Sequence, residues 1–168
     1  NGKKIVSAPH IYDSLKPLFE SHPDLIFDGE LYADKLSNDF NTIISLVRKT
    51  KPTQEDLEKS AEVIEYHIYD LPSYDGTFFS RNNQLKIMEV HLKVFKDTKC
   101  KIVNTCIALD ENSLMTLYTQ YMSEGYEGQI LRTNSHYENK RSKSLLKHKS
   151  FVDAEFKILG VEEGKGNH

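Results

Sequence analysis

Apolar residues recur at helical spacing in four parts of the chain. This spacing puts them on one face of a helix, as in a helix packed against a core. We expect three of the helices to begin near Pro9, at Asn38 or Asp39, and after Asp110, since these residue types suit a first turn, and the remaining helix to follow the turn cluster 72–76. Their buried faces are expected to carry Ile11, Leu15, Leu18 and Phe19; Ile43, Ile44, Leu46 and Val47; Leu85, Met88, Leu92 and Phe95; and Leu114, Leu117, Tyr118 and Tyr121. A shorter, polar helix is expected after the capping box Thr53-x-x-Asp56.

Segments rich in β-branched and aromatic residues separate these helices and predict six strands. The predicted strands are 25–32, 63–71, 101–109, 127–133, 144–149 and 154–161. Gly125 lies where the last helix should end. The last three strands follow one another without intervening helices, so the pattern favours an α+β fold over a doubly wound parallel sheet. We expect one domain over residues 1–161, with 162–168 as the start of a linker.

Composition supports a soluble globular domain. The 168 residues are 38% hydrophobic, 10% aromatic and 28% charged, with a net charge of -3, which argues against a disordered chain. No stretch is long and apolar enough to cross a membrane, and no apolar signal-peptide core follows the first residues. Cys100 and Cys106 are too few for a disulfide framework and lack the spacing of a metal site, so we expect a reducing, cytoplasmic setting.

Charge is unevenly distributed along the chain. Residues 1–84 hold 9 basic and 14 acidic residues, whereas residues 85–168 hold 13 and 11. The densest basic stretch, 136–149, contains five lysines and arginines and only one acidic residue, Glu138. Such a stretch suits a phosphate-rich partner, and a solvated loop is the simpler alternative.

Three carboxylates have positions that suit binding chemistry. Asp28 and Glu30 are two residues apart on a predicted strand, so both are expected on one face. They would bind a sugar hydroxyl or a metal; the alternative is that they lie on the solvent-exposed face of an edge strand. Glu127 is followed by Gly128, which permits close approach of a ligand or metal, although a simple turn explains the pair equally well.

An aromatic residue and a lysine pair complete the candidates. Tyr69 lies near the end of a predicted strand, where it would serve as a base-stacking platform or as part of the core. Lys147 and Lys149 alternate with His148, so the two ammonium groups share a strand face and His148 points away. Like charges on one face repel, so the pair favours a bound phosphate; lysines that protect a sheet edge are the alternative.

Four segments in order resemble motifs III, IIIa, IV and V of the covalent nucleotidyltransferases. They are Phe27-Asp28-Gly29-Glu30-Leu31, Tyr66-His67-Ile68-Tyr69-Asp70, Glu127-Gly128-Gln129-Ile130-Leu131-Arg132 and Leu145-Leu146-Lys147-His148-Lys149. Within that superfamily the chain is most similar to small, phage-type ATP-dependent DNA ligases. The resemblance spans nearly the whole chain, and the terminal Glu163-Gly164-Lys165-Gly166-Asn167 resembles the ligase linker into an OB fold.

The resemblance implies a nucleotidyltransferase domain of antiparallel sheets with flanking helices. It implies a lysyl-AMP intermediate, transfer of AMP to the 5′-phosphate of nicked double-stranded DNA, and sealing by the 3′-hydroxyl. Glu30 would contact the ribose and Tyr69 would stack on adenine. Glu127 would help to bind Mg²⁺ or Mn²⁺. Lys147 and Lys149 would contact the AMP phosphate, with Lys149 supporting phosphoryl transfer.

The family's nucleophile lies in a Lys-x-Asp-Gly motif, which these 168 residues lack. The nearest matches, Ile26-Phe27-Asp28-Gly29 and Ser73-Tyr74-Asp75-Gly76, have no lysine and stand in the wrong order. We therefore expect a ligase fragment without the nucleophile and the OB domain, inactive in adenylation by itself. A truncated sheet with an exposed edge would favour dimerisation. An RNA ligase and a non-catalytic nucleotide- or nucleic-acid-binding module are the alternatives.

Overall fold

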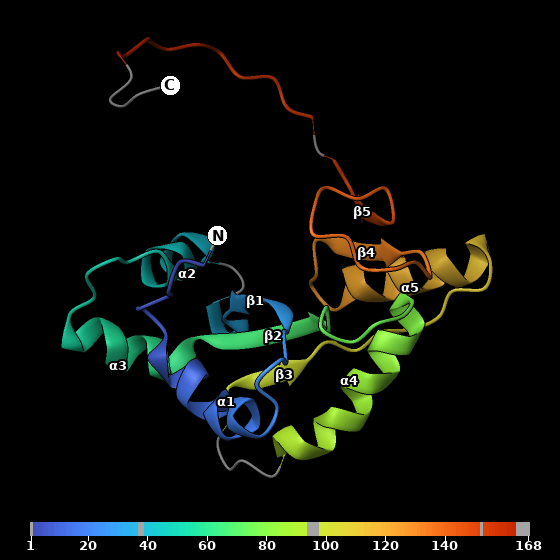
Figure 1. Ribbon diagram of the computed structural model, residues 1–168. Coiled ribbons are helices and arrows are strands. Elements are labelled where there is room, and N and C mark those ends of the chain that lie inside the picture. The colour runs from blue at the N-terminus through green and yellow to red at the C-terminus, as the bar shows by residue number, and fades with distance from the viewer. Residues whose placement is uncertain (1, 37–38, 94–97, 152, 164–168) are drawn as a thin grey trace. The chain divides into compact units, whose positions relative to one another are not determined.

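The computed structural model describes residues 2–36, 39–93, 98–151 and 153–163 (Figure 1). The chain forms two units: Asn1–Ile107 with Arg132–Leu145, and Ala108–Leu131 with Leu146–His168. Three sequence predictions fall outside the described residues: Asn38 as a helix cap, Phe95 as a core residue, and the linker residues 164–168; the side chain of Leu92 is also outside them.

The first unit is built on a mixed three-stranded sheet of β1 (Asp28–Tyr32), β2 (Glu65–Asp70) and β3 (Cys100–Ile102). β1 pairs antiparallel with β2, and β3 pairs parallel with β2. The helices are α1 (Pro9–Ser21), the 3-10 turn η1 (Asp34–Leu36), α2 (Phe40–Val47), α3 (Gln54–Val63) and α4 (Phe78–Lys93). The predicted helix starts are confirmed at Pro9, at Asp39, which accepts a hydrogen bond from the Thr42 amide, and at the Thr53 capping box.

One apolar face of this sheet packs against the helices. Ile64, Ile68, Leu71 and Leu85 are 0–1% exposed and form the centre of the core. Ile11, Leu15 and Leu18 of α1 and Ile43 and Leu46 of α2 join them, as the helical spacing predicts. Burial of such side chains contributes about 1.5–3 kcal/mol each, so this core holds the polar strand ends in place.

The second unit contains α5 (Glu111–Ser123) and most of the two-stranded sheet of β4 (Gly128–Arg132) and β5 (Leu145–Lys149). Asp110 caps α5 by accepting from the Ser113 amide, and Gly125 follows the helix with φ of 89°, both as predicted. The ring of Tyr118 stacks on His148 at 4.3 Å between centroids. The helix therefore packs on the face of β5 that carries His148.

Two predicted strands differ in the structure. The strand expected over 101–109 ends at Ile102, and residues 103–109 form no regular element. The strand expected over 154–161 is absent from the described residues 154–161, where Phe156, Ile158 and Leu159 are more than 80% exposed. Both segments have the composition of a strand. A strand also needs a neighbouring edge for its hydrogen bonds, and sequence propensity does not supply one.

Candidate functional site

Glu30 lies on the polar face of the three-stranded sheet. Its Cα partner across the ladder is His67, and His67 is in turn the partner of Lys101 on β3. Residues opposite one another share a sheet face, so these three side chains lie together, whereas Ile68 and Cys100 belong to the buried face. The sheet therefore separates an apolar core face from a polar face that carries Glu30.

The polar face also holds a charged cluster close to His67. The ligand atoms of Asp34, Glu65 and His67 lie within 4.8 Å of one another. Lys101 Nζ donates to Asp34 Oδ2 at 2.7 Å and to Glu65 Oε2 at 2.8 Å, and this pairing lowers the pKa of Asp34. Because an ammonium group already neutralises the carboxylates, we assign no metal to this cluster.

Tyr69 occupies an irregular position in the sheet. Asp28 pairs with Asp70, but the next residue, Gly29, pairs with Ile68, so the ladder passes over Tyr69. Such a bulge leaves the extra residue without a direct cross-strand neighbour, and bulges are common beside active sites, where they re-aim a side chain. The extra residue lies on β2, so the alternation along β1 is kept, and the charges of both Asp28 and Glu30 act on Tyr69.

Asp28 faces aromatic hydroxyl groups. It accepts a hydrogen bond from the Tyr137 hydroxyl at 3.0 Å through Oδ2. Burial, followed by the charges of Asp28 and Glu30, raises the pKa of Tyr69 to about 12. Burial and the bond to Asp28 likewise raise the pKa of Tyr137 to about 12. Both tyrosines are therefore neutral donors at physiological pH, and Tyr69 is close enough to Glu30 to feel its charge.

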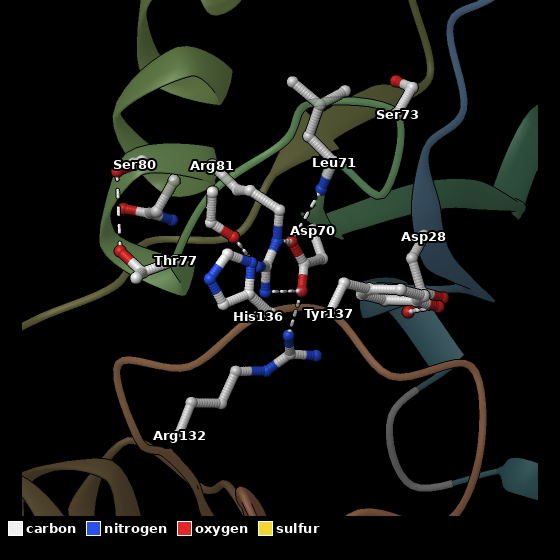
Figure 2. A network of polar contacts seen from close by, with 12 residues as sticks. Asp28, Asp70, Leu71, Ser73, Thr77, Ser80, Arg81, Arg132, His136 and Tyr137 are labelled. Atoms are coloured by element: carbon white, nitrogen blue, oxygen red, sulfur yellow. Dashed lines mark hydrogen bonds and ion pairs between the residues drawn. The ribbon is translucent and has the colours of Figure 1, made fainter.

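A buried carboxylate, Asp70, organises the side chains of Arg81 and Arg132 (Figure 2). Asp70 is 0% exposed and accepts from Arg81 Nε at 2.6 Å, Arg81 Nη2 at 3.0 Å, Arg132 Nη1 at 2.5 Å and the Leu71 amide at 2.8 Å. Four donors, two of them from a fork-shaped guanidinium, satisfy a buried carboxylate fully. Asp70 thus ties β2 to α4 and to the end of β4.

The two arginines of this cluster have different surroundings. Arg81 is almost completely buried and also donates through Nη1 to the carbonyl oxygens of Gly76 and Ser135, at 2.7 and 3.1 Å. The guanidinium of Arg132 lies over the rings of Tyr69 and Phe78, with its central carbon 5.2 and 4.8 Å from the two centroids. Arg81 therefore anchors Asp70, and Arg132 connects Asp70 to Tyr69.

The second unit brings two of the candidate residues together. Glu127 Oε2 and Lys149 Nζ lie 4.0 Å apart, and both side chains are open to solvent. Lys147 is exposed on the same strand. Gln129 Nε2 lies 3.1 Å from His148 Nδ1, and His148 stacks on Tyr118. His148 therefore points toward α5, as the predicted alternation of the strand requires.

Glycines set the close approach of the strands in both units. A Cβ atom at Gly29 would lie 2.5 Å from the His67 carbonyl oxygen and 2.7 Å from the Tyr66 ring. One at Gly128 would collide with the His148 carbonyl oxygen and lie 2.9 Å from two atoms of Lys149. The glycine beside each candidate carboxylate, Glu30 and Glu127, thus lets a neighbouring strand come near.

Asp70 and Arg132 belong to the motif segments, but no role was predicted for them, and Arg81 and Tyr137 were not predicted at all. A signal was available for Asp70. Strand alternation puts it on the apolar face of Ile68, and a charged residue is almost never fully buried without a partner. No comparable signal identified Arg81, because its partner lies 11 residues away on another element.

Comparison with known protein families assigns the chain to one of them. The family model described as "ATP dependent DNA ligase domain" matches residues 1–149 of the sequence, a stretch that includes all four motif segments. The chain belongs to the ATP-dependent DNA ligase domain family. A DNA ligase of Haemophilus influenzae is 27% identical over 168 residues, which are 99% of this chain and 59% of that protein. A DNA ligase of African swine fever virus is 28% identical over 97% of this chain and 38% of its own length.

Solved DNA ligases share the fold. The Chlorella virus DNA ligase-adenylate matches 88% of this chain and 52% of its own chain, with a TM-score of 0.61 and 20% identity. A Lig E DNA ligase matches 74% of this chain and 46% of its own, with a TM-score of 0.58 and 23% identity. The α+β ligase fold is therefore confirmed. The chain spans 59% of the length of its Haemophilus relative.

The family implies ATP and a divalent metal, and the donors of this domain fit both. An aromatic platform and a carboxylate on one sheet suit a nucleoside, and the lysine pair suits a phosphate. Glu127 offers hard oxygen ligands of the kind that Mg²⁺ accepts from one or two carboxylates alongside phosphate and water. Among the described residues no helix is long and apolar enough to cross a membrane.

Proposed function

We propose that this ligase domain forms part of an enzyme that seals nicks in double-stranded DNA through lysyl-AMP and DNA-adenylate intermediates. The observation that carries the proposal is the family match across residues 1–149, which contains the four motif segments in their expected order. The curated relatives are DNA ligases, which favours DNA over RNA as the substrate.

The first unit would bind the nucleoside. Tyr69 would stack on adenine and Glu30 would accept a hydrogen bond from a ribose hydroxyl. The support is geometric: the strand ladder passes over Tyr69, so the ring has no direct partner on β1. Burial, followed by the charges of Asp28 and Glu30, raises the pKa of Tyr69, which agrees with carboxylates close to the ring. A half-buried ring beside a solvent-exposed carboxylate fits an amphipathic ligand such as adenosine.

The second unit would bind the phosphate. Lys147 and Lys149 would donate to the oxygens of the α-phosphate, where negative charge develops during in-line attack. Glu127 would hold Mg²⁺ or Mn²⁺, which neutralises phosphate charge and orients the leaving pyrophosphate when it is bound. The separation of 4.0 Å between Glu127 and Lys149 supports placing the metal ligand and the phosphate donor side by side.

The covalent step needs a lysine that the 168 residues do not offer in the family's motif. We therefore propose that the nucleophile belongs to a longer polypeptide, in which 1–161 is part of the nucleotidyltransferase domain and 162–168 leads into an OB fold. Dimerisation of the isolated chain through an exposed edge of a truncated sheet stays a prediction, as does the cytoplasmic setting.

The test is Lys149→Ala in the full-length protein. Loss of one preorganised donor to a developing phosphate charge should slow adenylation by about 10²–10³-fold. Stability should change little, because removing one lysine relieves the repulsion with Lys147 on an exposed strand. Lys149→Arg should restore activity only partly, because a planar guanidinium places its donors differently.

The matched control is Lys143→Ala, which removes an exposed lysine from the same basic stretch. It should adenylate at the normal rate. A normal rate for Lys149→Ala, or a loss of rate equal to that of the control, would mean that Lys149 plays no part in phosphoryl transfer.

A further inference from the structure

We propose that Arg132 is a positioning residue that holds the Tyr69 ring as the platform for adenine. The inference rests on the proposed function, because it assumes that Tyr69 stacks on the base. It adds a residue to which the motif comparison gave no role, and it gives a function to the buried charge cluster of Asp70 and Arg81 that Arg132 contacts.

Tyr69 needs support from outside the sheet ladder. Asp28 of β1 pairs with Asp70 of β2, and the next residue of β1, Gly29, pairs with Ile68, so no residue of β1 is paired with Tyr69. A residue in a regular antiparallel pair packs against its cross-strand neighbour, which helps to fix its ring. The bulge removes this neighbour, and the ring orientation must therefore be set by other contacts.

Arg132 supplies that contact on one face of the ring. Its guanidinium lies over Tyr69 at 5.2 Å and over Phe78 at 4.8 Å, so it is packed against two aromatic rings. A guanidinium over a ring is attracted by the ring quadrupole and also stacks as a flat group. With one face of Tyr69 covered in this way, the opposite face is the one offered to a base.

Asp70 and Arg81 keep Arg132 in this place. Arg132 Nη1 donates to Asp70 Oδ2 at 2.5 Å, and Asp70 is fixed from the other side by Nε and Nη2 of Arg81 (Figure 2). Arg81 and Asp70 are 2% and 0% exposed, and Arg81 is further tied to two backbone carbonyl oxygens. Asp70 and Arg81, which hold Arg132 in place, therefore belong to the buried core.

The chemistry requires a guanidinium at position 132. A lysine keeps the positive charge for Asp70, but a compact ammonium cannot lie flat against Tyr69 while it also donates to Asp70. Arg132→Lys therefore separates the stacking role from the charge role. The buried carboxylate keeps a counter-ion in Arg81 in this variant, so the fold is expected to persist.

The test compares two ligands in the full-length, deadenylated protein. Equilibrium dialysis would measure the affinity for AMP, which has a base, and for ribose 5-phosphate, which has none. Tyr69→Ala should weaken AMP binding about 5- to 150-fold, the range of a lost base stack. Arg132→Lys should weaken it about 3- to 10-fold, in keeping with loss of a cation–π contact. Neither change should alter the affinity for ribose 5-phosphate.

Each other outcome has one meaning. A normal AMP affinity for Arg132→Lys, with a weakened Tyr69→Ala, overturns the positioning role and leaves the proposed function intact. A normal affinity for Tyr69→Ala overturns the stacking platform itself and this inference with it. Equal losses for AMP and ribose 5-phosphate in Arg132→Lys identify a general structural role and overturn the inference.

A second variant covers the case in which Arg132→Lys does not fold. Phe78→Leu removes the second ring that the Arg132 guanidinium contacts and leaves the charge pairs of Asp70 unchanged. It should show the same selective loss of AMP affinity. Unchanged AMP affinity in Phe78→Leu, together with a lower AMP affinity in Tyr69→Ala, would overturn the positioning role of Arg132.

Discussion

Replacing Asp70 with Asn should destabilise the first unit strongly. Asn keeps the size of the side chain and one acceptor oxygen, but it removes the negative charge between two arginines. Arg81 is the residue most affected, because its side chain is 3% exposed and two of its donors are directed at this carboxylate. It would remain buried without a counter-ion.

The magnitude follows from burial. Breaking a buried ion pair by removing one partner costs about 3–5 kcal/mol, mostly because the remaining charge stays desolvated. The Arg132 side chain, at 14% exposed, retains some access to water and adds less to the cost. We therefore expect Asp70→Asn to lower the free energy of unfolding by about 3–5 kcal/mol.

Urea denaturation followed by circular dichroism would measure this loss. The matched control is Asp34→Asn, which breaks an ion pair with Lys101 at 2.7 Å between side chains that are 53% and 48% exposed. Solvent-exposed pairs contribute about 0–1 kcal/mol, so the control should be nearly neutral. A loss below about 1 kcal/mol for Asp70→Asn, or one equal to that of the control, would refute the claim that the buried cluster holds this unit together.

Three further predictions concern chemistry and packing. The isolated 168-residue chain, incubated with α-labelled ATP and metal and then denatured, should retain no label, since it lacks the Lys-x-Asp-Gly motif; retained label would contradict this. Gly128→Ala should push β5 away from β4 and speed amide hydrogen exchange at Lys149. Gly160→Ala is the control, because a Cβ atom there meets no atom within 4 Å. Equal exchange in the two variants would argue against close packing of β5 on Gly128. The pKa values of Tyr69 and Tyr137 are about 12, so their burial should add stability that is complete below pH 10 and is lost as the pH rises through 12. Asp28→Asn should lower both pKa values in an ultraviolet titration. Unchanged values would show that the charge of Asp28 does not raise them.

The helices were predictable because their signals are local. Asp39, Thr53 and Asp110 cap their helices by bonds to backbone groups within three residues, so residue type and spacing contain the necessary information. The strand lengths were not predictable in the same way. Val103–Leu109 has the composition of a strand, but the ladder with β2 ends at Ile102. Pairing depends on a partner edge that is distant in the sequence.

The site was predictable only in part, for the same reason. The sequence pattern indicated the face of Lys147 and Lys149, and the structure places His148 on the opposite side, against Tyr118. The bulge at Tyr69 was not predictable, because it depends on the register between β1 and β2 and not on the local sequence of either strand. The cluster around Asp70 joins residues 11 and 62 positions apart, which no local spacing rule connects.

We propose that Glu30 and Tyr69 of the first unit bind the nucleoside of an adenylate group and that Lys147 and Lys149 of the second unit bind its phosphate. Titration of the isotope-labelled chain with AMP, followed by NMR, tests this proposal most directly. We expect concentration-dependent shifts at these four residues, with the Tyr69 ring among the most affected, and no comparable shifts at the exposed controls Lys16 and Glu20 on α1. Saturating AMP that left Tyr69 and Lys149 unchanged, or that shifted a different surface, would contradict the account.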